Sequence, residues 1–321
     1  MGFRLLKKAI ETLITVFVAS LVLFALIRLA PGDPAKLLIG STFEVAIDVE
    51  AYDAAVNETR EQMGLTESVP NQYFSWMGSL LQLDLGNSYY TGRAVTEELG
   101  ERLPATLLLA AAALLIQVIL GFVVGTLSAV YNGAFFDTAV RVICVGLASI
   151  PGFVIGLLLL LLLAVQFGVY EITSQASLPR LWLPALTMGL LGAPQMIRVV
   201  RANLLSELGQ VYIQSAVSRG LSQRRVVWHA MRNALIPTIT MIGLSFTAFI
   251  GGAVIIESIF AWPGLGEYAL EAILNKDYPV LQGYALLTVV SVVIIHIIVD
   301  AIYAVLDPRV SRRQERAVTN E

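Results

Sequence analysis

The sequence has few charged residues and almost no means of covalent cross-linking. Of its 321 residues, 14% are charged and 57% are hydrophobic, and the mean hydropathy is +0.75. Soluble globular chains are usually about a quarter charged and less than half apolar. The composition therefore predicts a protein that crosses a membrane several times. The single cysteine, Cys144, excludes an internal disulfide, and its apolar surroundings indicate a buried structural thiol.

The motifs of several catalytic classes are also missing. None of the four lysines follows a glycine-rich loop, so the chain has no P-loop of its own for ATP. The two histidines, His229 and His296, are far apart, and no His/Cys cluster has the spacing of a metal site. Protease and hydrolase motifs are absent as well. We therefore expect no catalytic residues, no metal and no cofactor in this chain, and no nucleic-acid partner.

Six long apolar runs dominate the remainder of the sequence. A span needs about 20 apolar residues, and the runs predict helices at 9–29, 104–130, 138–167, 183–204, 235–257 and 280–305. We interpret the first run as an uncleaved helix rather than a signal peptide, because it is long and closely bracketed by charges. Lys and Arg are concentrated at the amino end, in 198–232 and in the tail, which places these segments in the cytoplasm. The predicted fold class is an all-α membrane protein with six transmembrane helices and both termini cytoplasmic.

Residues 30–103, between the first two spans, differ in kind from the rest. They contain twelve acidic residues and four basic ones, together with aromatic side chains such as Tyr73 and Trp76. Ala54–Met63 and Asn71–Leu81 have the spacing of short amphipathic helices. Because disordered acidic segments usually lack aromatics, we expect a small, ordered outer insert.

Several residues inside the predicted spans suggest how the helices pack. Gly121 and Gly125 are four apart, as are Gly152 and Gly156, a spacing that favours close helix packing in lipid. Gln117 and Gln195 are polar residues within spans. Arg198 and Arg201 lie near the cytoplasmic end of the fourth span, where long side chains can reach the interface. His296 and Asp300 share a helix face; they could form a proton relay, but we favour a hydrogen-bonded pair near the cytoplasmic end.

The stretch Val211–Pro237 is basic and polar between two apolar runs. It contains four arginines and no acidic residue. We expect a short helix from Glu207 to Arg219 that ends at Gly220, since glycine readily adopts the left-handed conformation. Ser222 is then the N-cap of a second helix, Gln223–Ala234, that runs into the fifth span near Pro237. Such a pair of helices could anchor to anionic lipid or dock a cytoplasmic partner.

The same stretch resembles the coupling loop of a known family. Gln214-Ser215-Ala216-x-x-x-Gly220, followed by Ala234-Leu235-Ile236-Pro237, is similar to the glutamate-alanine-alanine loop of bacterial ABC importer permeases. Its departures, Gln-Ser-Ala in place of Glu-Ala-Ala and a longer interval to the proline, resemble the oligopeptide/dipeptide/nickel branch. Further stretches resemble that branch in the same order along the chain: Leu29-Ala-Pro-Gly-Asp-Pro34, Leu83-Asp-Leu-Gly-Asn-Ser88, Arg102-Leu-Pro-Ala-Thr106 and Phe260-Ala-Trp-Pro-Gly-Leu-Gly266.

The resemblance implies a type I ABC importer permease fold and a set of partners. These are a second homologous permease, two cytoplasmic ABC ATPase subunits that bind ATP and Mg, an extracytoplasmic substrate-binding lipoprotein, and membrane lipid. The coupling loop would sit in a cleft of the ATPase. The residues expected at this contact are Glu207, Tyr212, Gln214, Ser215, Ala216, Arg219, Gly220, Leu221, Ser222, Arg224 and Arg225.

The sequence thus predicts a non-catalytic, multi-pass permease subunit of the inner membrane that imports peptides. Nickel or a metal chelate is the alternative cargo, and a proton-coupled transporter using His296 and Asp300 is the alternative of another class. The expected divisions are a first span (1–29), an outer insert (30–103), spans two to four (104–206), coupling helices (207–234), spans five and six (235–305) and a basic tail (306–321).

Overall fold

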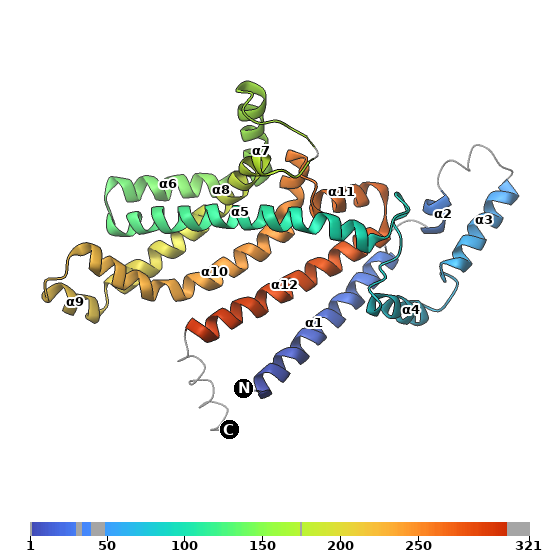
Figure 1. Cartoon of the computed structure of the whole chain (residues 1–321), viewed down its shortest axis with the longest axis horizontal. Coiled ribbons are helices and arrows are strands. Elements are labelled where there is room, and N and C mark those ends of the chain that lie inside the picture. Colours follow the sequence, from blue (N-terminus) through green and yellow to red (C-terminus); the bar gives the residue numbers. More distant parts are fainter. Residues whose placement is uncertain (1, 30–33, 40–48, 174, 307–321) are drawn as a thin grey trace. The chain divides into compact units, whose positions relative to one another are not determined.

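The computed structural model describes residues 2–29, 34–39, 49–173 and 175–306, and these ranges are helical apart from turns and one isolated bridge between Asn87 and Ala94 (Figure 1). This confirms the all-α prediction. The helices are α1 (Gly2–Leu29), α2 (Pro34–Ile39), α3 (Val49–Gln62), α4 (Val69–Leu81), α5 (Val95–Val130), α6 (Phe135–Ser149), α7 (Gly152–Leu160), the π-helical η1 (Leu161–Gln166), α8 (Leu178–Leu208), α9 (Val211–Ser218), α10 (Gln223–Phe260), α11 (Leu265–Asn275) and α12 (Tyr278–Leu306).

The chain divides into two compact units. Unit 1 comprises Met1–Pro104 and Glu267–Ser291, and unit 2 comprises Ala105–Gly266 and Val292–Glu321. All three chain boundaries fall within helices, since α5 continues through Pro104, α11 through Gly266 and α12 through Ser291. The sequence divisions at 29, 103, 206, 234 and 305 remain expectations of organisation along the chain.

Four helices in the described ranges are long and apolar enough to cross a membrane: Val95–Val130, Leu178–Leu208, Pro237–Phe260 and Tyr278–Val299. A bent pair of helices makes a fifth span if it is counted as one. The apolar part of α1, Ile10–Leu26, is shorter. Several membrane spans are therefore present, while the full count of six stays a prediction. The basic tail at 307–321 and part of the motif at 29–34 lie outside the described residues.

The third span was predicted as one helix over 138–167, and this is wrong. The structure breaks it between α6 and α7, which are bent by 96°. Ile150 has extended backbone angles, φ −91° and ψ 130°. The reason is Pro151, because the proline ring disfavours a helical conformation in the residue before it. Gly152 then begins a new helix in a different direction.

Unit 2 is held together by close approaches of α8 to its neighbours. A Cβ added to Gly121 on α5 would overlap Met196 on α8, and one added to Gly125 would lie 2.9 Å from the Ile197 carbonyl oxygen. Gly152 on α7 approaches Leu191 of α8 to 2.9 Å by the same measure. These contacts confirm close packing at the pair Gly121 and Gly125 and at Gly152. Gly156 has only ordinary van der Waals clearance.

A polar junction crosses the middle of unit 2. Gln117 is 1% exposed and donates its amide to the Gly192 carbonyl of α8 at 3.1 Å and to the Ser245 hydroxyl of α10 at 3.0 Å. Since an amide in hydrocarbon needs partners, this residue ties α5, α8 and α10 together at mid-length. Gln195, by contrast, is exposed.

The carboxyl-terminal end of α10 is held by a second set of buried hydrogen bonds in unit 2. Glu257 is fully buried; its Oε1 accepts the Thr106 hydroxyl at 2.7 Å and its Oε2 accepts the Gly266 amide at 2.6 Å. Trp262, also fully buried, donates its indole N–H to the Ala105 carbonyl at 3.0 Å. The Trp-Pro-Gly-Leu-Gly stretch thus folds around a buried carboxylate. The connection predicted over 258–279 also contains a full helix, α11, that was not anticipated.

In unit 1, the described residues of the acidic insert form helices, of which α4 packs against α1. Tyr73 of α4 is buried, contacts Phe17 and Phe24 of α1 edge-on, and shares a hydrogen bond with Ser20 at 2.9 Å. The predicted helices at Ala54–Met63 and Asn71–Leu81 correspond to α3 and α4. All three acidic residues in 95–103 belong to the first turns of α5, which begins at Val95 rather than at 104.

Candidate coupling site

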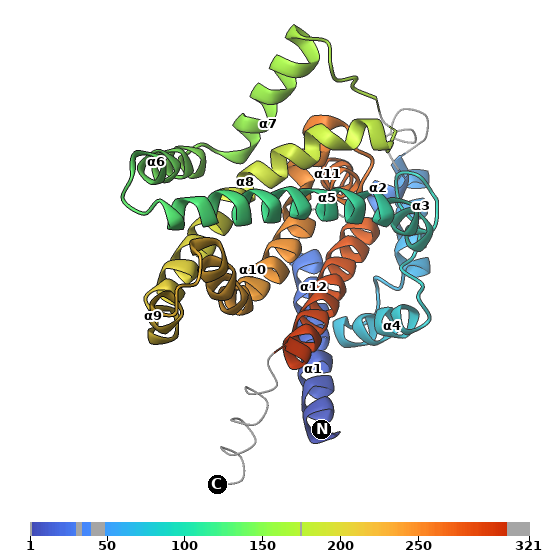
Figure 2. The same ribbon diagram turned by 60° about the vertical axis from the view of Figure 1, so that its left-hand side comes forward.

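The basic segment forms a compact helical turn between two long helices of unit 2. α8 ends at Leu208, and Gly209 and Gln210 form the bend before α9 begins at Val211. The first helix was predicted from Glu207; the structure instead gives Glu207 to the last turn of α8. Figure 2 shows α9 beside the adjoining ends of α8 and α10.

Gly220 ends α9 as expected. Its φ is +79°, its amide donates to the Val217 carbonyl at 2.8 Å, and the next amide, of Leu221, donates to the Ala216 carbonyl at 3.2 Å. These two bonds are those of a Schellman motif, which satisfies the last carbonyls of a helix. The chain therefore reverses at a fixed angle, and a side chain at Gly220 would have space but a strained backbone.

Ser222 then starts α10. Its backbone is extended, with φ −64° and ψ 149°, and its carbonyl accepts the first amides of the helix. The N-cap position is thus confirmed, although its hydroxyl makes no capping bond. α10 continues for 38 residues through Pro237 to Phe260. The predicted second helix and the predicted fifth span are one unbroken element.

Apolar side chains fix α9 against its neighbours. Ile213 is 3% exposed and lies in a cluster with Leu204 of α8, Val226 and Ala230 of α10, and Ala129 at the end of α5. Ala216 is 6% exposed on the same side of α9, three residues from Ile213 as a helix face requires. The small helix is thus packed onto the ends of three long ones, and a displacement of α9 must displace them.

Tyr212 links the two arms of the turn by hydrogen bonds. Its hydroxyl donates to Glu207 Oε2 at 2.7 Å and accepts the Asn233 amide at 2.9 Å. Partial burial, followed by the hydrogen bond to Glu207, raises the pKa of Tyr212. The phenol is therefore neutral at physiological pH and stays available as the donor between α8 and α10.

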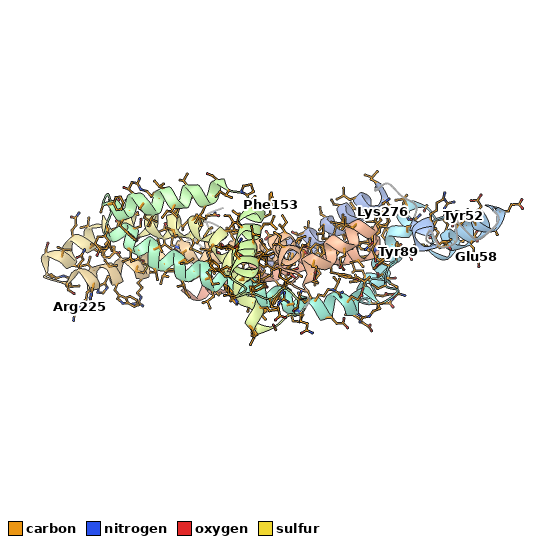
Figure 3. The ribbon with its side chains drawn as sticks, turned by 90° about the horizontal axis from the view of Figure 1, so that it is seen from above. Tyr52, Glu58, Tyr89, Phe153, Arg225 and Lys276 are labelled. Atoms are coloured by element: carbon orange, nitrogen blue, oxygen red, sulfur yellow. The ribbon has the colours of Figure 1, made fainter. Side chains whose placement is uncertain are left out.

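The remaining surface of the loop is exposed and mixed in character. Of the expected contact residues, eight are exposed: Tyr212, Gln214, Ser215, Arg219, Gly220, Ser222, Arg224 and Arg225. Ala216 is buried, and Glu207 and Leu221 are half-buried. Arg225 lies at the outer margin of this part of the ribbon (Figure 3).

Sequence reasoning missed three apolar side chains on this surface. Val211, Val217 and Trp228 are 74%, 56% and 71% exposed. Aromatic and arginine side chains together are typical of the centre of protein interfaces, and exposed apolar residues at a polar turn indicate a partner. These three residues could have been identified from the sequence, because they lie among arginines in a segment already predicted to lie outside the membrane.

Of the two residues considered for proton coupling, His296 is the one whose side chain the structure describes. His296 is exposed, and its Nδ1 lies 2.8 Å from the Val292 carbonyl of its own helix. The side chain of Asp300 lies outside the described part of the structure. In the described residues no group of three or more His, Cys, Asp or Glu side chains could hold a metal ion.

Comparison with known proteins matches nearly the whole chain. Residues 117–312 match the family of binding-protein-dependent transport system inner membrane components, and residues 1–110 match the amino-terminal family of the same membrane components. The glutathione transport system permease proteins GsiC of Escherichia coli O6:H1 and Pectobacterium atrosepticum are each 32% identical over 306 residues, covering 95% of this chain and 97% of the relative.

A solved structure supports the fold. A chain of the inward-facing MetNI methionine ABC transporter superposes with a TM-score of 0.55 at 21% identity, over 65% of this chain and 96% of that one. At this identity the likeness concerns the fold alone. From the family match and the long relatives together, this chain belongs to the binding-protein-dependent transport system inner membrane components, the non-catalytic permease subunits of ABC importers.

Proposed function

We propose that this chain is one of two homologous permease subunits of an ABC importer for peptides, with α9 as its contact to an ATPase subunit. The observation that carries the proposal is the turn around α9: an exposed basic and apolar surface fixed rigidly onto the ends of α5, α8 and α10. The chain has no P-loop, so the energy for transport must come from a partner.

The arrangement suggests how motion reaches the membrane. α10 starts at the turn and extends 38 residues, which is about 57 Å at 1.5 Å per residue. Gln117 and Ser245 tie its middle to α5, and Glu257 fixes its far end. A push on α9 would therefore tilt a stiff lever instead of bending a loop. ATP-driven closure of the two ATPase subunits is the proposed source of that push.

The peptide cargo rests on the relatives. The two GsiC permeases serve glutathione, a tripeptide, and they match 95% of this chain. The ordered outer insert, with α3 and α4, is the proposed docking surface for the substrate-binding lipoprotein. Nickel or a metal chelate would be the competing cargo, and uptake assays with the partner binding protein present distinguish the two.

The test of coupling uses the complete importer in proteoliposomes. Gln214→Arg places a new charge on the exposed face of α9, and Ala216→Arg forces one into its packed side. We expect both to abolish peptide uptake and to lower substrate-stimulated ATP hydrolysis, while the chain still inserts. Gln175→Arg, the same exchange as Gln214→Arg at an exposed site of the outer connection, is the control and should transport normally. Normal uptake by both α9 variants would overturn the coupling assignment.

A further inference from the structure

A cavity of about 360 Å³ opens between α5, α6 and α8, next to the ends of α5 and α8 that adjoin the coupling loop. Its lining combines charge and apolar surface. The charged residues are Arg141 of α6 and Arg198 and Arg201 of α8. The apolar residues include Val140, Val145 and Ile197. Neither the coupling contact nor the lever uses this cavity.

One of the three arginines is neutralised within the protein. Arg201 was expected to extend to the membrane interface, but its Nε and Nη2 donate to the two oxygens of Asp137 at 2.7 and 2.8 Å. Asp137 is fully buried and also accepts the Ser128 hydroxyl at 2.6 Å and the Gly133 amide at 3.0 Å. This bidentate pair fixes the turn between α5 and α6 against α8, and its Arg201 lines the cavity.

The other two arginines keep their charge available. Arg141 is 55% exposed, and its Nε lies 3.7 Å from Asp137 Oδ2, a weak contact to a carboxylate that Arg201 already holds. Arg198 is exposed and pairs with no carboxylate in the described part of the chain. Three guanidinium groups and one carboxylate leave two positive charges facing the cavity.

The cavity continues along an apolar surface. A second cavity of about 310 Å³ shares Arg141 and Val145 with the first and is also lined by Thr138 and Val142. Val142 and Val145 are 66% and 61% exposed on α6. Arg141 is six residues past the start of α6, about 9 Å along the helix. The charged group of Arg141 therefore lies next to an exposed apolar strip formed by Val142 and Val145.

We propose that this cavity binds an anionic phospholipid of the cytoplasmic leaflet, with its phosphate between Arg141 and Arg198 and an acyl chain along Val142 and Val145. A soluble anion would need the arginines but not the apolar strip, and an acidic protein segment would not be expected at the depth of a membrane helix. Basic pockets between membrane helices on this side commonly hold anionic headgroups. The bound lipid would brace α6 against α8 beside the coupling loop.

The test counts lipids retained by the complete, purified importer. Native mass spectrometry with phosphatidylglycerol and phosphatidylethanolamine present compares the wild type with the Arg141→Gln/Arg198→Gln double variant. Each arginine near an anionic surface is worth about fivefold in binding, ~1 kcal/mol, so we expect the double variant to bind phosphatidylglycerol roughly 25-fold more weakly. Arg232→Gln, at an exposed arginine of α10 outside the cavity, should bind as the wild type does. Arg141→Lys/Arg198→Lys should restore most of the retention.

A second arm separates the lipid from its soluble counterpart. Phosphatidylglycerol in mixed micelles should raise the thermal midpoint of the wild-type importer, and inorganic phosphate at millimolar concentration should not. Equal stabilisation by phosphate would overturn the proposal in favour of a soluble anion. Equal retention of lipid by the wild type and the double variant would also overturn it. A raised KM for peptide with unchanged lipid retention would instead place the two arginines on the translocation path.

Discussion

The two ends of α10 are built on opposite principles. At Phe260 the helix ends in a buried polar knot, where Glu257, Trp262 and Phe260 are fully buried and the Arg180 guanidinium donates to the Phe260 carbonyl at 3.0 Å. At Gln223 it begins in an exposed, basic turn whose contacts are apolar packing on one side and solvent on the other. One end is buried and fully hydrogen-bonded, and the other is exposed and is the end proposed to meet a partner.

The comparison indicates that the buried end of α10 contributes mainly to stability, whereas the exposed end is the one proposed for function. Buried, fully paired polar groups give directional contacts that are costly to break. A packed apolar face under an exposed surface allows a rigid body to be pushed without losing its shape. The following predictions act on one end or the other, and their expected effects decrease in the order given.

Removal of the Glu257 carboxylate should be the most damaging change. Glu257→Ala leaves the Thr106 hydroxyl and the Gly266 amide without an acceptor and opens a cavity, which typically costs about 3–5 kcal/mol for a buried network. We expect a large fall in the thermal midpoint and little folded protein in the membrane. Glu171→Ala, at an exposed glutamate of the outer connection, is the matched control. A normal thermal midpoint for Glu257→Ala would show that the hydrogen bonds of Glu257 do not stabilise the carboxyl-terminal end of α10.

Gly264→Ala should disturb the hydrogen-bonded cluster around Glu257 more mildly. A Cβ there would overlap the Glu257 carboxyl group, and overpacking of a buried site usually costs about 1–3 kcal/mol. Gly146→Ala, where a Cβ meets nothing within 4 Å, should leave the midpoint unchanged or slightly raised. Thermal unfolding of both variants in detergent provides the measurement, and equal midpoints would contradict the close approach.

At the other end, Gly220→Ala should affect coupling more than stability. The φ of +79° costs an L-residue about 1–2 kcal/mol, so the turn would relax and α9 would shift. We expect reduced uptake, with a fall in the thermal midpoint no larger than that of the Gly264 variant. Gly146→Ala again serves as the control, since its site is open and its φ is ordinary. Full uptake by Gly220→Ala would show that the left-handed turn at Gly220 is not needed for coupling.

The smallest effect is expected for Tyr212→Phe. It deletes the hydroxyl that joins Glu207 to Asn233 at a partly exposed site, where a hydrogen bond contributes about 0.5–1.5 kcal/mol. We expect more ATP hydrolysed for each peptide imported, because the two arms of the turn are less firmly joined. Tyr131→Phe, at an exposed tyrosine outside the loop, is the control and should keep the wild-type ratio of ATP hydrolysed to peptide imported. An unchanged ratio for Tyr212→Phe would show that its hydroxyl does not contribute to coupling.

The sequence was most informative where the signal is local. Gly220 predicted a left-handed helix end, Ser222 predicted the start of the next helix, and apolar length predicted most of the spans. The break at Pro151 was equally local, since Ile150-Pro151 carries the signal, but it was outweighed by an uncharged run long enough for one helix. The residues proposed for coupling also followed from a local pattern, and their contact with an ATPase stays a prediction.

By itself the sequence determined the helical membrane class, the permease family and the position of the helical turn proposed for coupling, because composition, hydropathy and motifs are properties of neighbouring residues. Only the tertiary structure decided which polar groups meet. Arg201 pairs with Asp137, 64 positions away, and Glu257 meets Thr106 across 151 positions. Nothing in one sequence encodes such partners directly, since they depend on how the helices pack, and that packing gives α10 one buried end and one exposed end.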